Sequence, residues 1–444
     1  MFAKLLKHPV FKNSFISFMG FGATGLLGYI FQFFISRRLA VSEYGEFQSL
    51  VALLGILGVG SAALSYFVIA HTSVFAHHQD WQANRQFIAW LRQKLSPVLI
   101  ISFGLFLILS WPVAQALHLT SVWSAVVIGI VVMLSISTVV YTAVFTGWQN
   151  FVATNTLAVA GTFLKLLAGV TIITFFPSAS AATLILVVSV VGTWFLARIW
   201  SSKKLKLHER VPSTDISSWR EKYFAGRPVA ADLGFIVGFT FLALFIQNAD
   251  VLLVKHFASA DLAGHYGAFN LLGKMILWIN LGIVSVVLPI AIAHEHAGTV
   301  ISPRVRLYAY TLIGLISMGA IGLYLLTPGF IIKLSIGTNY LLYAPALWLI
   351  GLMNALLSLL LLEANFAFAR RDRAVLPMLG IAALVFAAGI MLSPTAIAGV
   401  AKSGIVAFGL GGMSVLLLNL RASQYKTKVA AAEVVPARVT GGPL

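Results

Sequence analysis

Apolar residues in this chain come in runs of twenty or more, and this feature restricts the possible folds more than any other. Buried helices of soluble proteins use shorter apolar stretches, of about 10–14 residues. Only 10% of the 444 residues are charged, whereas a soluble domain carries about 25%. A backbone in lipid must satisfy its own hydrogen bonds, and the alternating pattern of an outer-membrane barrel strand is absent from the sequence. The sequence therefore predicts an all-α integral membrane protein.

About twelve transmembrane helices are expected from the apolar runs and the polar breaks between them. They are predicted at about residues 13–35, 46–70, 95–117, 122–146, 152–176, 179–199, 229–250, 267–292, 307–331, 341–367, 374–393 and 396–420. The first run follows three lysines, as the core of a signal peptide does, but it is too long for such a core and no small-residue cleavage site ends it. We therefore expect it to be retained as the first helix.

The distribution of lysine and arginine predicts the orientation in the membrane. If the N-terminus is cytoplasmic, the predicted outward loops contain only Arg37, Arg38, Lys255 and Lys333. Most other basic residues then fall in inward segments, as the positive-inside rule requires. We expect both termini in the cytoplasm. The net charge of +17 then reflects topology and anionic membrane lipid, with no need for a nucleic-acid partner.

A basic, polar stretch near the middle of the sequence divides the chain into two halves. The predicted organisation is a first lobe of six helices at 1–200, a cytoplasmic basic linker at 201–228, a second lobe of six helices at 229–420 and a cytoplasmic, disordered tail at 421–444. An even number of helices in each lobe gives both lobes the same orientation. We therefore expect the two lobes to be parallel repeats, as in several transporter folds.

Two correspondences between the halves support this repeat. The segment 37–43, which ends in Glu43, corresponds to the segment 255–261, which ends in Asp261, at a distance of 218 residues along the chain. Pro112, predicted to end the third helix, corresponds to Pro328, predicted to end the ninth, at a distance of 216 residues. Two nearly equal distances are typical of a duplicated architecture.

Three short motifs occur in order along the chain. They are Glu43-Tyr44-Gly45-Glu46-Phe47 after the first helix, Gly147-Trp148-Gln149-Asn150-Phe151 after the fourth, and Asp250 to Lys255 with Gly264-His265-Tyr266 and Gly273-Lys274 in the seventh and eighth. In identity, order and spacing they resemble the motifs of bacterial polysaccharide exporters, including O-antigen flippases. Those proteins belong to the multidrug/oligosaccharidyl-lipid/polysaccharide flippase superfamily. The resemblance covers essentially the whole chain.

This resemblance implies a multi-pass flippase of the bacterial cytoplasmic, or inner, membrane. Such a protein moves an undecaprenyl-diphosphate-linked oligosaccharide outward through a cationic cavity, by alternating access and without hydrolysing ATP itself. The resemblance also implies glycosyltransferases and a glycan polymerase of the same pathway as partners. It implies no enzymatic activity and no cofactor, metal or catalytic residue.

Other functions remain open at this stage. A peptidoglycan-precursor flippase and a drug/cation antiporter are alternatives within the same superfamily. A membrane-embedded glycan polymerase or glycosyltransferase is the alternative from a different class. An enzyme of that kind needs acidic residues close together at the membrane surface, and the 13 acidic residues of this chain are scattered.

Five ionisable residues fall inside predicted helices, where a charge costs a few kcal/mol and usually faces a cavity or a partner. Lys165, Lys274 and Lys402 are candidates for binding the substrate diphosphate, because a lysine ammonium is a compact point charge. Asp250 and Glu363 are candidates for coupling transport to an ion.

Four of the five candidates also have a structural alternative, whereas Lys165 lies too near the middle of its helix to snorkel easily. Lys274 and Lys402 lie near the outer boundary, where a lysine can snorkel to the lipid headgroups. For the two acids, the alternatives are pairs with nearby basic residues, Asp250 with Lys255 and Glu363 with Arg370. Asp250 is also placed to cap the end of its helix.

Polar residues near two of these lysines recur at helical spacing, so each set lies on one face of its helix. One set consists of Asn270, Lys274, Trp278 and Ser285 on the eighth helix, and the other of Asn155, Thr162 and Lys165 on the fifth. A polar face on an apolar helix is typical of a wall exposed to water. We expect these residues to line a cavity.

Overall fold

The computed structural model describes residues 9–205, 229–296 and 303–434 of the chain. Every regular element in these ranges is a helix, and twelve stretches are long and apolar enough to cross a membrane. Each stretch coincides with one of the predicted apolar runs, which confirms the all-α class and the predicted number of helices. Residues 206–228 of the predicted linker and 435–444 of the predicted tail lie outside the described residues.

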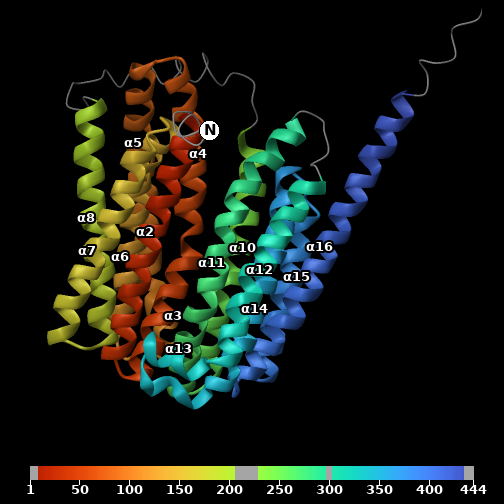
Figure 1. The fold of residues 1–444 in the computed structure, drawn as a ribbon. Coiled ribbons are helices and arrows are strands. Elements are labelled where there is room, and N and C mark those ends of the chain that lie inside the picture. The colour runs from red at the N-terminus through yellow and green to blue at the C-terminus, as the bar shows by residue number, and fades with distance from the viewer. Residues whose placement is uncertain (1–8, 206–228, 297–302, 435–444) are drawn as a thin grey trace, which may run out of the picture. The chain divides into compact units, whose positions relative to one another are not determined.

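The chain divides into two units, whose α-helices are labelled in Figure 1. Unit 1 consists of residues 1–240 together with Ser335–Asn339. Its helices are α2 (Pro9–Arg38), α3 (Val41–Leu57), α4 (Val59–His77), α5 (Trp81–Ala116), α6 (Val122–Gly147), α7 (Phe151–Phe175) and α8 (Ala179–Leu205). The helices α3 and α4 together form one candidate span.

Unit 2 consists of residues 241–334 and 340–444. Its elements are α10 (Val229–Phe257), which enters the unit at Phe241, α11 (Ala260–His296), α12 (Pro303–Leu326), α13 (Pro328–Leu334), the 3-10 helix η1 (Thr338–Ala346), which enters the unit at Tyr340, α14 (Leu347–Ala369), α15 (Val375–Leu392) and α16 (Ile397–Val434). The last helix continues beyond residue 420, so the first part of the tail that was expected to be disordered is helical.

The helices of both units pack in the same pattern. In unit 1, α6 packs against α4, α5 and α8, and α7 packs against α8. In unit 2, α14 packs against α11, α12 and α16, and α15 packs against α16. These helices, which occupy corresponding positions along the chain, therefore have corresponding neighbours, whereas α2 of unit 1 also packs against α7. This confirms the predicted two-lobed repeat, while the cytoplasmic location of the termini stays a prediction.

The proline correspondence behind that prediction is wrong. Pro112 lies inside α5, and Pro328 is the first residue of the short helix α13. A proline tolerated within a long membrane helix does not mark its end. The repeat is therefore supported by the packing and by the 37–43 and 255–261 segments, and not by the prolines.

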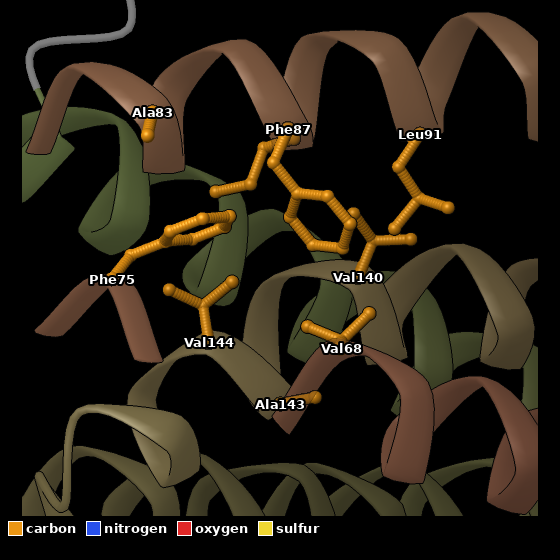
Figure 2. Packing of buried hydrophobic residues seen from close by; sticks show 9 residues of the cluster. Val68, Phe75, Ala83, Phe87, Leu91, Val140, Ala143 and Val144 are labelled. Carbon is orange, nitrogen blue, oxygen red and sulfur yellow. The ribbon is translucent and has the colours of Figure 1, made fainter. Parts of the chain in front are cut away.

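The third helix begins at Trp81, well before the apolar run predicted at about residues 95–117. The Asp80 side chain accepts a hydrogen bond of 2.9 Å from the Ala83 N–H and so caps the first turn. Figure 2 shows Ala83, Phe87 and Leu91 pointing toward buried side chains of α4 and α6. These spacings of four residues place the apolar side chains on one helix face. The polar residues between them shortened the apolar run and concealed the start of the helix.

Turns in both units share one construction. Gln79, His118, Gln149 and Arg371 all have a left-handed φ, between 46° and 57°. After Gln149, the Asn150 N–H donates to the Phe145 carbonyl at 2.8 Å, and the Asn150 side chain then accepts from the Ala153 N–H at 3.2 Å. The motif Gly147–Phe151 therefore ends α6 with a Schellman turn and begins α7 with a capping asparagine.

The Glu-Tyr-Gly-x-Phe motif lies in the first two turns of α3. The Glu43 carboxylate accepts a hydrogen bond from the Ala179 N–H at the start of α8. The Glu46 carboxylate, which is buried, accepts from both the N–H and the hydroxyl of Thr120, each at 3.0 Å. A negative charge is favourable near a helix N-terminus. The two acids of the motif therefore join α3 to the segments that begin α6 and α8.

Candidate functional site

The strongest concentration of buried polar side chains among the predicted site residues lies on α10 and α11 of unit 2. The Tyr266 hydroxyl donates a hydrogen bond of 2.7 Å to the Asp250 Oδ2 atom, and both side chains are buried. The Lys274 Nζ atom donates to the Asn248 Oδ1 atom at 2.9 Å. Lys274 also attracts the Asp250 carboxylate electrostatically. The structure therefore brings together Asp250 and Lys274, which the sequence identified separately.

Asn270 belongs to the same group of side chains. Tyr266, Asn270 and Lys274 follow each other at intervals of four residues, which places them on one face of α11. Asn270 is buried, and its Oδ1 atom has no hydrogen-bond partner among the described residues. The Oδ1 atom of Asp250 is likewise buried without a partner there. Each of these buried oxygen atoms can still accept a hydrogen bond from a donor that reaches it.

The alternative partner proposed for Asp250 is wrong. Its side chain bonds to Tyr266 and interacts with Lys274, and no contact joins it to Lys255 in the part of the chain that the structure describes. Lys255 lies more than one helical turn beyond Asp250 on α10. Asp250 also lies inside that helix, which continues to Phe257, so it does not cap the end.

The four residues of the α11 set differ in exposure along the helix. Asn270 is buried and Lys274 is half-buried, whereas Trp278 and Ser285 are exposed. The Ser285 hydroxyl donates to the carbonyl of Gly282 in its own helix at 2.7 Å. The predicted polar face therefore begins inside unit 2 and continues onto an exposed surface of α11.

Lys165 lies over an aromatic ring in unit 1. Its Nζ atom is 4.9 Å from the centroid of the Phe31 ring on α2, and Phe31 is buried. A side chain added at Gly169, one turn further along α7, would come within 2.7 Å of the same ring. The absence of a side chain at Gly169 thus allows α7 to approach Phe31 closely and keeps the lysine over the ring. No carboxylate partners Lys165 within the described ranges.

The other two residues of the α7 set also have local partners. Asn155 lies against Gly20 of α2, where an added Cβ atom would be 2.3 Å from the Asn155 Oδ1 atom. The Thr162 hydroxyl donates to the Ala158 carbonyl of its own helix at 3.0 Å. The face that was predicted to line a cavity therefore contacts α2 near both of its ends, at Asn155 and at Lys165.

Glu363 lies in a network that the sequence did not predict. Tyr310 of α12 donates a hydrogen bond to the Glu363 carboxylate, and so does the Asn419 side chain of α16. Arg370 donates to Asn419 at 2.6 Å. The proposed direct pair of Glu363 with Arg370 is therefore wrong, because Asn419 lies between them. The network joins α12, α14 and α16.

Arg370 follows the last residue of α14 and has a carboxylate beside it. Its Nη2 atom is 3.6 Å from the Asp372 Oδ2 atom. Burial lowers the pKa of the Arg370 guanidinium, and the neighbouring Asp372 charge opposes that change. An arginine stays protonated under these conditions, so this end of α14 keeps its positive charge.

The third lysine, Lys402, is in the second turn of α16 and is exposed. It joins none of the three groups described above in the part of the chain that the structure covers. The polar residues of these groups that were not singled out in the sequence are Asn248, Tyr310 and Asn419. Asn248 had a usable signal, since it lies two residues before Asp250 in an apolar run. The other two become partners only when distant helices pack together.

Comparison with known proteins connects this chain to transporters through its fold. No family model and no curated protein sequence matches the chain. The inward-facing conformation of a multidrug resistance MATE family transporter of the MOP superfamily matches 90% of this chain and 95% of its own, with a TM-score of 0.70 and 12% identity.

Two further solved structures match about as well. The MATE multidrug transporter DinF-BH has a TM-score of 0.64 and 13% identity, covering 94% of this chain and 96% of its own. A MOP superfamily transporter from Pyrococcus furiosus, for which a reverse polarity of the binding pocket suggests a different function, has the same TM-score, identity and coverage. This chain therefore has the two-lobed, all-helical fold of the MATE transporters of the MOP superfamily.

Proposed function

We propose that this protein is a flippase that moves an undecaprenyl-diphosphate-linked oligosaccharide across the bacterial cytoplasmic membrane by alternating access. The MATE-like fold supports transport in general, because the similar structures are transporters. The motifs Glu43–Phe47 and Gly147–Phe151 favour the polysaccharide branch of the superfamily. Three of the five ionisable residues inside predicted membrane helices are lysines, and this excess of positive charge favours an anionic substrate.

The observation that carries this proposal is the environment of Lys165. Its ammonium group lies over the Phe31 ring near the middle of a membrane helix, and no carboxylate neutralises it within the described residues. A cation–π contact contributes about 0.5–2 kcal/mol, which is less than the cost of about 3 kcal/mol for a lysine at the centre of a membrane helix. A diphosphate that pairs with Lys165 supplies the missing stabilisation.

Asp250 and Lys274, which interact electrostatically without a direct hydrogen bond or ion pair between them in the described part of the chain, are proposed as the ion-coupling site. The lysine attracts the Asp250 carboxylate and also bonds to Asn248. When an anionic substrate draws Lys274 away, Asp250 loses its neighbouring positive charge and binds a proton or a sodium ion more tightly. By linkage, ion binding at Asp250 then releases Lys274 for the substrate to the same extent.

The first test follows flipping of a fluorescent undecaprenyl-diphosphate oligosaccharide in proteoliposomes. We expect Lys165→Ala to slow flipping about 10- to 100-fold, since a hydrogen bond to a charged group contributes about 1.5–3 kcal/mol. Lys165→Arg should retain part of the activity, because it keeps the charge but not the shape. Lys94→Ala is the matched control, because Lys94 is exposed outside the predicted membrane region of α5.

Flipping by Lys165→Ala at the wild-type rate would remove the main support for an anionic substrate. A drug/cation antiporter is the second candidate, and the multidrug transporters of similar fold together with the buried Asp250 favour it. In that case the same proteoliposomes would move a cationic dye and leave the glycan lipid in place. Labelled peptidoglycan precursor, tested in parallel, distinguishes the third candidate.

The second test separates the two candidate coupling acids. Proteoliposomes receive a pH gradient in one arm and a sodium gradient in the other, which identifies the ion. We expect Asp250→Asn to abolish the response of flipping to the effective gradient. Glu363→Gln serves as the control, because Glu363 is an equally buried carboxylate whose described partners, Tyr310 and Asn419, are neutral. A gradient response that is lost in Glu363→Gln and kept in Asp250→Asn would move the coupling site to α14.

A further inference from the structure

Each unit contains a polar pair that joins its first membrane helix to its second. In unit 1, the Gln48 side-chain amide donates a hydrogen bond of 3.1 Å to the Gln32 Oε1 atom. In unit 2, the Tyr266 hydroxyl donates a hydrogen bond of 2.7 Å to the Asp250 Oδ2 atom. The members of both pairs are 16 residues apart in sequence. The two hydrogen bonds therefore connect the same two places in the repeated fold.

The register of the repeat supports this equivalence. Gln32 and Asp250 are 218 residues apart, and so are Gln48 and Tyr266. The same distance separates Glu43 from Asp261, which lie in the segments between the two members of each pair. One register thus relates the first helix, the loop and the second helix of both units, with no insertion between them.

The chemistry of the two pairs differs, although their position does not. Gln32 and Gln48 are neutral at every physiological pH, and Gln48 also donates a hydrogen bond to the Tyr44 hydroxyl. Asp250 can lose its proton, and one of its oxygen atoms lacks a partner in the described part of the chain. The residue that corresponds to Lys274 in the register of 218 is Ile56, which is buried. The lysine is thus also replaced by an uncharged residue.

We infer that Gln32 is the neutral counterpart of Asp250, and that it limits the transporter to one coupled cation in each cycle. The inference rests on the coupling role proposed above for Asp250. An acid at both positions would give two ion sites in equivalent places, one in each unit. A glutamine at position 32 keeps the hydrogen bond between the helices and removes the charge.

The inference predicts that one isosteric change at position 32 creates a second ion-binding acid, even though Ile56 stands where unit 2 has Lys274. Gln32→Glu has nearly the shape of the native side chain, and the Gln48 amide remains in place to donate to the new carboxylate. The side chain at position 32 is only half-buried. We therefore expect the new charge to be tolerated in the folded protein.

The experiment measures the number of ions coupled to each glycan lipid. Proteoliposomes with the labelled undecaprenyl-diphosphate oligosaccharide are brought to steady state at several ion gradients. The logarithm of the glycan distribution is then plotted against the logarithm of the gradient, and the slope gives the number of coupled ions. We expect a slope of about one for the wild type, about two for Gln32→Glu and about zero for Asp250→Asn. Gln32→Asn, which stays neutral, should keep the wild-type slope.

The outcomes separate this inference from the proposed function. A slope that stays at the wild-type value in a folded, active Gln32→Glu variant overturns the inference, and so does a slope that changes in Gln32→Asn. Retention of the wild-type slope by Asp250→Asn contradicts the proposed coupling site instead. If Gln32→Glu is inactive, Gln48→Glu places the acid on the other side chain of the pair. A slope of about two for Gln48→Glu then supports the inference, and a slope at the wild-type value overturns it. Thermal unfolding in detergent identifies variants that fail to fold.

Discussion

Buried charges in this protein are stabilised by different kinds of partner. Lys165 lies over the Phe31 ring, Asp250 accepts a hydrogen bond from Tyr266, and Glu46 accepts two hydrogen bonds from Thr120. The partners of Glu46 are a backbone N–H and the hydroxyl of the same residue, so both of its oxygen atoms are bonded at one place. Glu46 therefore has a structural role, in contrast to Asp250, which keeps one oxygen atom without a donor in the described part of the chain.

The Glu46 contact predicts a large effect of one substitution on stability. Glu46→Ala removes the carboxylate and leaves the Thr120 N–H and hydroxyl without their acceptor, so we expect unfolding to become easier by about 3 kcal/mol. Thermal unfolding in detergent measures the change. Asp261→Ala is the control, because the Asp261 side chain is 66% exposed, and surface changes stay within about 0.5 kcal/mol. If Glu46→Ala lowers the midpoint of thermal unfolding no more than Asp261→Ala does, the Glu46 contact does not stabilise the protein.

At the scale of elements, the turns determine where each helix ends. In the turn after α6, Gln149 takes a left-handed φ of 55°, and Asn150 caps the next helix. The corresponding turn after α14 contains Arg371 with a φ of 57°, and the Asp372 N–H donates to the Ala367 carbonyl at 3.1 Å. The same backbone geometry therefore occurs in both units, even though neither turn uses the glycine that this geometry favours.

A substitution at Gln149 tests this account of the turn. Gln149→Gly should stabilise the protein by about 1 kcal/mol, because a glycine adopts a left-handed φ without steric cost. Gln149→Val should destabilise it, since a branched Cβ makes that conformation worse. The midpoints of thermal unfolding of the two variants should fall on opposite sides of the wild type. A lower midpoint for the glycine variant would mean that the Gln149 side chain has its own stabilising contact.

At the scale of the whole molecule, hydrogen bonds join loops that were predicted to be outward. Glu43 at the start of α3 bonds to the start of α8, and Glu46 bonds to Thr120 before α6. Three predicted outward segments of unit 1 therefore meet at one end of that unit. This agrees with helices that cross the membrane alternately, and it leaves the direction of crossing to be measured.

Reporter fusions test that direction. We expect fusions near Arg85, Arg371 and the C-terminus to report a cytoplasmic location, and fusions near Ser42 and Ser259 to report the outer side. The physical reason is the concentration of lysine and arginine in the inward segments. A C-terminus on the outer side would contradict the cytoplasmic location of both termini, because twelve crossings return the chain to the side on which it began.

The sequence by itself determined the class of the fold, the number of membrane helices and the residues whose charge needs an explanation. In lipid these properties depend on each segment alone, because each spanning segment must be apolar and must form its own backbone hydrogen bonds. Lys165, Asp250 and Lys274 were recognisable for the same reason, since a charge within an apolar run is visible without knowing its neighbours.

Only the tertiary structure decided which of these residues lie together. Asp250 and Tyr266 meet because the fold brings these points of α10 and α11 within hydrogen-bonding distance, and Glu363 reaches Asn419 across 56 positions of the chain. The start of α5 was hidden for a related reason, because its apolar face is covered by α4 and α6 rather than by lipid. Contacts between helices depend on the shapes and distances of side chains from separate segments. A hydrophobic pattern within one segment carries no information about them.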